Sequence, residues 1–361
     1  MRTLHLLGTL TLISALPACG GGDGTGTPST QAKGSPKSTS DQTSEASGFD
    51  PGPVADGYTR FTAKTISAVD PGGDVTYCQY VMAPTDHDVD VMNLTGAQSE
   101  IGHHAIAFAY TGDGTQEVGT ILPCMGTEFT MGNDGAATDA TSMQDATGES
   151  LSIGGFLGAA GSNGKTGVKL PDGVAFRLRK GDGIMMNVHY LNTSDHPIDG
   201  NSVIDVKFAE VDPDRLIAAM FVNVNLGFKL APEAQTTSST ECVAQSDIKM
   251  LMMTNHMHDY GSSATSVVLP AGGGDPQMLH DDPTWTYDMQ FNANYSTWTV
   301  DAPFTVHSGD TIKTTCNWTN MDAKEVDFPR EMCVGVGFIL ATGQDPHAPA
   351  CINGQWLPQY F

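Results

Sequence analysis

Apolar and polar residues alternate in short runs along most of the chain, and Gly, Asp, Asn and Pro interrupt these runs about every ten residues. The segment Val203–Val211 is the clearest case, because alternate side chains would face opposite sides of a strand. Long helical periodicity is absent, and no alternation of strands and helices favours a doubly wound or barrel enzyme. The pattern predicts an all-β protein.

Further strands are predicted wherever the same pattern is bounded by turn residues. They cover residues 105–110, 174–178, 184–191, 216–224, 248–258, 284–291, 311–318 and 332–340. Tight turns at Lys180–Gly183 and His307–Asp310 lead into strands at comparable positions of the two halves of the chain.

The part of the chain that can fold exceeds the usual size of a single core, since it has roughly 310 residues. A polar, proline-containing stretch at Val211–Asp214 separates two apolar strands. We place a domain boundary there, with an N-terminal domain over residues 51–211 and a C-terminal domain over residues 212–361.

The N-terminus has the features of an export signal. Arg2 is followed by an apolar run, Leu4–Leu16, that is too short to span a bilayer as a helix. The sequence Leu16-Pro17-Ala18-Cys19 resembles a bacterial lipobox, so we expect a lipoprotein signal peptide over residues 1–18 and lipidation of Cys19. The alternative is an ordinary cleaved signal in which Cys19 is an incidental thiol.

Composition sets the expected partners. Residues 19–50 are mostly Gly, Ser, Thr, Pro, Gln and Lys, which predicts a disordered linker because so few apolar residues cannot form a core. The formal net charge of -24 is spread over the chain and argues against nucleic acid and anionic lipid surfaces as partners. We therefore expect an exported monomer, anchored to a bacterial membrane (the outer membrane or cell surface) only through its N-terminal lipid.

Six cysteines remain when Cys19 is set aside. An even number in an exported protein predicts three disulfides, and the chain has no CxxC pair that would indicate a zinc knuckle. Their spacing alone leaves fifteen pairings open. The six are Cys78, Cys124, Cys242, Cys316, Cys333 and Cys351.

Five of the eleven histidines lie in three tight contexts, which are His103-His104, His189 and His256-Met257-His258. Residues two apart on a strand point to the same face, so His256 and His258 can reach one metal ion. Adjacent histidines on a regular strand point to opposite faces. If His103 and His104 share a metal, either the backbone is irregular there or the two rings use different nitrogens.

The face that carries His256 and His258 continues through Met250, Met252 and Thr254, so the pair is expected at the end of an apolar row. Five further histidines have polar or turn-like neighbours and are predicted to lie on the surface. They are His87, His196, His280, His307 and His347. The tryptophans Trp285, Trp298 and Trp318 are predicted to belong to the core.

The order of these motifs, His-His, Val-His-Tyr, His-x-His and Met-Cys, resembles the copper type II, ascorbate-dependent monooxygenases, the family of peptidylglycine α-hydroxylating monooxygenase and dopamine β-monooxygenase. The resemblance extends from about Thr76 to Cys351. It also includes the cysteine strand at Cys78, the cysteine strand at Cys242, and Leu216–Met220, which is similar to the strand that opens the second domain of the family.

The resemblance implies two tandem jelly-roll β-sandwich domains and two copper ions. The first copper would be held by His103, His104 and His189, and the second by His256, His258 and Met332. A thioether ligand favours Cu(I), the oxidation state that must meet O2.

The same resemblance implies that O2 and a small-molecule substrate react at the second centre, where His256, His258 and Met332 are the catalytic ligands. The first centre would deliver the second electron, and ascorbate or another one-electron donor would reduce both. The implied disulfides are Cys78–Cys124, Cys242–Cys351 and Cys316–Cys333.

Two positions depart from the family pattern. Thr254 stands where peptidylglycine enzymes carry the arginine that grips the substrate carboxylate, and Val336 stands where family members carry a tyrosine. Amidation of a glycine-extended peptide is therefore not expected. A neutral or cationic substrate fits better with the acidic chain. The alternatives are a non-catalytic lipoprotein that binds or buffers copper and an adhesin or carbohydrate-binding sandwich in which the histidines are structural. Zinc remains an alternative to copper at the all-histidine site.

Overall fold

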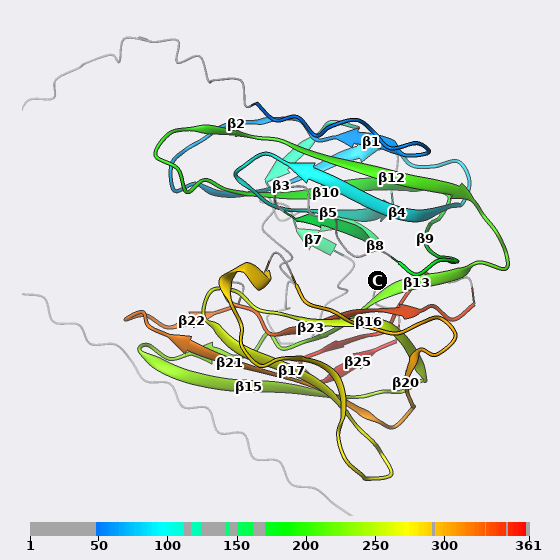
Figure 1. Cartoon of the computed structure of the whole chain (residues 1–361), viewed down its shortest axis with the longest axis vertical. Coiled ribbons are helices and arrows are strands. Elements are labelled where there is room, and N and C mark those ends of the chain that lie inside the picture. The colour runs from blue at the N-terminus through cyan, green and yellow to red at the C-terminus, as the bar shows by residue number, and fades with distance from the viewer. Residues whose placement is uncertain are drawn as a thin grey trace, which may run out of the picture. The chain divides into compact units, whose positions relative to one another are not determined.

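The computed structural model describes residues 48–111, 117–123, 142–144, 150–161, 170–290, 293–328, 330–343 and 346–358. The predicted signal peptide, Cys19 and nearly all of the predicted linker lie outside the described residues. The prediction of an all-β fold is confirmed, since strands dominate the described residues (Figure 1). No helix among them has the length and apolar character needed to cross a membrane.

The strands of the N-terminal half precede residue 211. They are β1 (Thr59–Thr62), β2 (Ile66–Val69), β3 (Asp74–Met82), β4 (Val89–Gln98), β5 (Gly102–Thr111), β6 (Ile121–Pro123), β7 (Ser142–Gln144), β8 (Ser150–Gly161), β9 (Val174–Leu178), β10 (Asp182–Leu191), β11 (Ile198–Gly200) and β12 (Ser202–Glu210).

The elements of the C-terminal half follow. They are β13 (Leu216–Val224), β14 (Lys229–Leu230), β15 (Ala234–Val243), β16 (Ile248–His256), β17 (Gly261–Leu269), β18 (Gln277–Asp282), the 3-10 helix η2 (Tyr287–Gln290), β19 (Ser296–Thr297), β20 (Phe304–Val306), β21 (Thr311–Asn320), β22 (Val326–Asp327), β23 (Val334–Leu340), β24 (Ala350–Ile352) and β25 (Gln355–Leu357).

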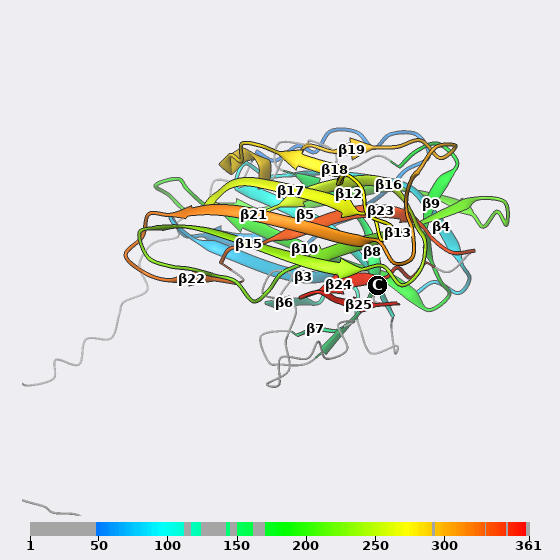
Figure 2. The same ribbon diagram turned by 90° about the horizontal axis from the view of Figure 1, so that it is seen from below.

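Each half is a jelly-roll-like sandwich of two sheets. In the N-terminal half, the strand order β1-β12-β4-β9 faces the order β6-β3-β10-β5-β8-β7, and side chains of both layers meet in one buried cluster. In the C-terminal half, β13, β23 and β16 face the sheet β15-β21-β17-β18, whose strands lie side by side in Figure 2. The period-two pattern gives each strand one apolar face, and these faces are buried between the two sheets.

The predicted boundary falls in the connection between β12 and β13. One sheet nevertheless continues past it, because β9 pairs in parallel with β13 at Val174↔Leu216 and Ala175↔Ile217. The result is an 11-stranded sheet that contains strands of both halves.

The two predicted turns are present and have the same hydrogen bonds. The backbone N–H of Asp182 donates to the carbonyl of Arg179, and that of Asp310 donates to the carbonyl of His307. In each turn the aspartate side chain accepts a backbone N–H in return, from Arg179 and from His307 respectively. Each turn also holds a glycine at positive φ, a conformation that favours glycine over other residues.

The predicted strand over residues 284–291 is wrong. Its middle forms η2, and Met289 donates its backbone N–H to the carbonyl of Thr286. Of the described members of the apparent apolar row, Trp285 alone is buried, while Tyr287 is exposed. Among the described residues no strand pairs with this segment. The alternating residues therefore have no neighbouring strand to hydrogen-bond with.

Candidate metal centres

The first centre lies on the neighbouring strands β5 and β10. His189 of β10 is directly opposite His104 of β5, and the next pair is Tyr190 with Gly102. His103 is therefore the extra residue of a β-bulge, which turns its ring to the same side as that of His104. The bulge supplies the irregular backbone that two adjacent histidines need to approach one ion.

Close packing before the bulge explains Gly102. Its backbone N–H donates to the carbonyl of Ser99 at 2.7 Å. A Cβ atom at this position would lie 2.2 Å from Cβ of Gln98, closer than real carbon atoms approach. The tight turn that leads into His103 thus requires glycine.

The three imidazoles gather at one point. His103 Nδ1 lies 2.9 Å from His104 Nδ1, and one ligand nitrogen from each of the three rings lies within 4.8 Å of the others. The ring centroid of His189 is 4.3 Å from that of His103 and 5.1 Å from that of His104. All three side chains are half-buried, and this donor set fits a copper or zinc ion.

Burial keeps the rings of His103 and His104 neutral. Burial lowers the pKa of His103 far below its ordinary value, and the neighbouring His104 and His189 lower it further. Burial likewise lowers the pKa of His104. A neutral imidazole has a free lone pair, so the site presents nitrogen donors that need not lose a proton to bind a cation.

Asp74, the first residue of β3, contacts the centre from its exposed side. Its Oδ1 lies 2.5 Å from His189 Nε2, and the side chain is 66% exposed. The hydrogen bond from His189 lowers the pKa of the Asp74 carboxyl. Sequence analysis missed Asp74, because nothing in its neighbourhood marks it before β3 and β10 are paired.

The second centre begins where β16 ends. His256 Nε2 and His258 Nε2 lie 3.1 Å apart, and the two rings are nearly perpendicular. His258 Nδ1 lies 3.2 Å from the carbonyl of Arg330; as the donor in this contact it leaves Nε2 free for a ligand role. Burial, followed by the charge of His258, lowers the pKa of His256 to about 3.

Strand register puts Met332 close along the chain to the residue that pairs with His256. Val334 of β23 is directly opposite His256, and Met332 precedes Val334 by two residues. β23 itself begins at Val334, so Met332 lies just ahead of the strand and is not its first residue as the sequence predicted. Met332 is buried beside Val222, Val224 and Val334, and Val334 is the residue that pairs with His256.

The apolar row leading to His256 is shorter than predicted. The register with β23 shifts between Met250 and Met252, because Leu251 is an extra residue on β16. Met252 consequently packs in the same cluster as Phe338, whereas Met250 packs with Ile339 on the other face. The row is Met252, Thr254 and His256, and the assignment of Met250 to it is wrong.

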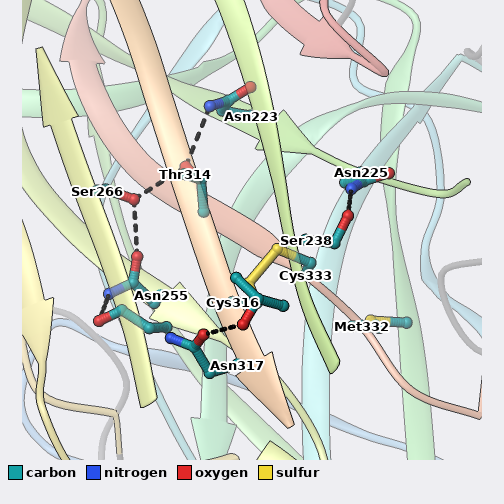
Figure 3. The surroundings of a disulfide bond; sticks show 12 residues. Asn223, Asn225, Ser238, Asn255, Ser266, Thr314, Cys316, Asn317, Met332 and Cys333 are labelled. Atoms are coloured by element: carbon teal, nitrogen blue, oxygen red, sulfur yellow. Dashed lines mark hydrogen bonds between the residues drawn. A yellow bond between two sulfur atoms is a disulfide. The ribbon is translucent and has the colours of Figure 1, made fainter. Parts of the chain in front are cut away.

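Two disulfides confirm two of the predicted pairings. Cys242–Cys351 has a Cα–Cα distance of 6.0 Å and Cys316–Cys333 one of 5.8 Å. Figure 3 shows the second bond beside Met332. Cys124 lies outside the described residues, so Cys78–Cys124 stays a prediction.

A buried polar chain runs past this disulfide (Figure 3). Asn223 donates to Thr314 Oγ1 at 3.0 Å, Thr314 and Ser266 share a hydrogen bond of 2.9 Å, and Ser266 donates to Asn255 Oδ1 at 2.7 Å. A Cβ atom on Gly335 would lie 2.6 Å from Thr314 Oγ1. These hydrogen-bonded side chains are buried inside the sandwich, and Asn255 belongs to β16, the strand that ends in His256.

The two centres influence each other electrostatically. After burial and the neighbouring rings, the charges of His258 and His256 are further causes that lower the pKa of His103. Arg330 and His258 similarly act on Asp74 after its bond to His189.

The other described histidines differ in their exposure to solvent. His87, His196 and His307 are exposed as predicted, and His347 is half-buried with Nε2 2.8 Å from an Arg179 nitrogen. The prediction is wrong for His280, which is 4% exposed. Ser296 Oγ lies 2.9 Å from its Nδ1, and this hydrogen bond offsets part of the cost of burying a polar ring. Asp282 Oδ2 lies 3.2 Å from its Nε2, which makes no hydrogen bond among the described residues. Trp285 and Trp318 are buried as predicted, and Trp298 is half-buried.

No family model matches the chain, and no curated protein matches its sequence. Among solved structures it is similar to PBCV-1 VP54 fitted into a reconstruction of the virophage Sputnik, with 8% identity over 79% of this chain and 95% of that chain and a TM-score of 0.27. It is also similar to the T=1 particles derived from infectious bursal virus, with 9% identity over 84% and 74% and a TM-score of 0.19. Likeness at this level carries no argument about function.

Proposed function

We propose that the chain is an exported copper monooxygenase that hydroxylates a C–H bond of a small substrate. The observations that carry the proposal are the gathering of His103, His104 and His189, the closeness of His256 to His258, and the strand register that puts Met332 two residues before the partner of His256. Copper bound at these centres would supply one-electron transfer and O2 activation. Zinc is disfavoured at the second centre because methionine is a poor zinc ligand.

The residues divide the work. The rings of His103, His104 and His189 would hold an ion that exchanges single electrons, whereas the soft thioether of Met332 would favour the reduced ion. One O2, two electrons and two protons convert the C–H bond into C–OH and release one water. Ascorbate or a similar donor gives up electrons singly, which suits two separate one-electron centres.

The wall beside the second centre supports a substrate without a carboxylate anchor. Thr254 is buried, and its hydroxyl donates to the carbonyl of Asn255. Val336 lies directly opposite Thr254 on β23. These two positions, where the sequence departs from the peptidylglycine enzymes, offer no cation, so a neutral or cationic substrate is the better candidate.

Export and lipid anchoring belong to the same proposal. The disulfides Cys242–Cys351 and Cys316–Cys333 are typical of an oxidising compartment outside the cytosol. Mass spectrometry of the mature N-terminus tests the anchor: a diacylglyceryl group on Cys19 is expected, and an unmodified Cys19 would favour an ordinary cleaved signal.

The deciding experiment measures copper content and substrate-dependent O2 consumption with ascorbate as the donor. Two equivalents of copper and coupled product formation are expected with a correct substrate. Two equivalents of copper without turnover on any candidate would favour the copper-buffering alternative. A protein that takes up no copper would favour an adhesin or carbohydrate-binding sandwich with structural histidines.

A further inference from the structure

Glu331 is a fully buried carboxylate between the exposed Arg330 and the candidate ligand Met332. Acidic side chains rarely lie in such a place without several hydrogen-bond donors, because burial removes the water that stabilises their charge. The partners of this carboxylate therefore indicate why it is there.

Three backbone N–H groups donate to Glu331. His258 and Met332 donate to Oε1 at 2.5 and 2.8 Å, and Tyr260 donates to Oε2 at 3.0 Å. None of the three donors belongs to a strand, since β16 ends at His256, β17 begins at Gly261 and β23 begins at Val334. The carboxylate replaces the ladder partners that these turns lack.

These bonds join the two segments that carry the donors of the second centre. His258 belongs to the turn between β16 and β17, and Met332 belongs to the segment leading into β23. Further contacts hold the first of these segments: Trp285 Nε1 donates to the carbonyl of His258 at 3.0 Å, and the ion pair between Arg330 and Asp259 spans both segments at the surface. The buried link between them is made by Glu331.

We propose that Glu331 is a positioning residue, whose carboxylate fixes the spacing between the imidazole of His258 and the thioether of Met332. The inference rests on the proposed function, in that these two side chains bind one copper ion. It adds a role for a residue that has no metal-facing atom of its own. Polar groups behind metal ligands commonly set ligand geometry, and their loss weakens metal binding about 10- to 100-fold.

The test compares Glu331→Gln with Glu325→Gln in the full chain loaded with copper. Glutamine keeps the shape but places an NH2 group against the N–H of Tyr260, so one bond becomes a repulsion between two donors. We expect Cu(I) affinity at the second centre to fall about 10- to 100-fold, with loss of sulfur scattering in X-ray absorption, while the histidine centre keeps its copper. Glu325 pairs with Lys229 at the surface, and its variant should match the wild type.

A second measurement needs no metal. Amide hydrogen exchange of the metal-free wild type should be slow at His258, Tyr260 and Met332, and faster at these positions in Glu331→Gln. Fast exchange at all three amides in the wild type would overturn the inference. This outcome does not depend on the variant, so it remains informative if Glu331→Gln fails to fold. Unchanged copper affinity together with unchanged protection in a folded variant would overturn it as well. If the wild type binds no copper at this centre but the three amides exchange faster in the variant, the proposed function fails. The inference that Glu331 holds the two backbone segments together then stands.

Discussion

The two centres differ first in the chemistry of single donor atoms. Three imidazoles form the first, and Met332 brings a thioether to the second. A soft sulfur donor stabilises Cu(I) more than Cu(II), whereas imidazole binds both oxidation states. One side-chain atom would therefore account for the different roles proposed for two centres that are otherwise built from histidine.

Met332→Ile tests this assignment. Isoleucine has a similar volume, so the free energy of unfolding should change by less than about 1.5 kcal/mol. Hydroxylation should be abolished because the thioether is lost, while copper stays bound at His103, His104 and His189. Product formation and copper content of the purified variant are the measurements. Full turnover by the variant would exclude Met332 from the oxygen site.

Asp74 acts on the first centre through His189. Asp74→Ala should lower copper affinity there about 10- to 100-fold, because the carboxylate holds the ring and increases its donor strength. Asp86→Ala is the matched control, since Asp86 makes an equally short contact with His87, an exposed ring outside both centres. Copper titration against a competing chelator measures both variants. Equal affinities in the wild type and Asp74→Ala would remove Asp74 from the centre.

Much of each donor set could be recognised from residue type and spacing, but not its supporting atoms. The separation of His256 and His258 by one residue predicts one shared face on any strand. Asp74 is distant from His189 in sequence. Glu331 is acidic, and acidic residues are usually exposed, so the sequence gives no reason to expect it in a buried position. Both became visible only through the pairing of β3 with β10 and the closeness of two turns.

At the scale of elements, β-bulges determine which side chains meet. His103 is the extra residue of β5, and Leu251 is the extra residue of β16. A bulge changes which face the following residues occupy, so a strict period of two misplaced Met250. The alternation predicted most strands well, including residues 174–178 and 216–224, but the register shifts depend on partners distant in sequence.

The two disulfides should have different effects. Removing Cys316–Cys333 by substituting both cysteines with alanine should cost on the order of 3 kcal/mol and also weaken copper binding at the second centre, because Cys333 adjoins Met332. Removing Cys242–Cys351 opens a longer loop and should cost more stability, about 4–5 kcal/mol, with copper affinity preserved. Denaturant unfolding and copper titration separate the two effects. Equal copper affinities in both double variants would disconnect Cys333 from the centre.

At the scale of the whole molecule, the half-buried rings of the two centres make metal-free stability depend on pH. Burial lowers the pKa of His256 to about 3, against 6.5 for an ordinary histidine. Between these values the unfolded chain binds a proton and the native protein does not, so this contribution to stability is present above pH 6.5 and is lost as the pH falls towards 3. Burial acts on His103 and His104 in the same direction.

His256→Gln isolates one such proton. Glutamine does not titrate, so the free energy of unfolding of the metal-free variant should fall less steeply with acid than that of the wild type, by on the order of 1.4 kcal/mol per pH unit between pH 6 and 4.5. Urea unfolding of both proteins at several pH values in this range measures the difference. His103 and His104 are present in both proteins, and burial, the leading cause of their lowered pKa, is the same in both. Parallel curves would mean that His256 is protonated in the native state and that the second centre is more open to water than its burial indicates.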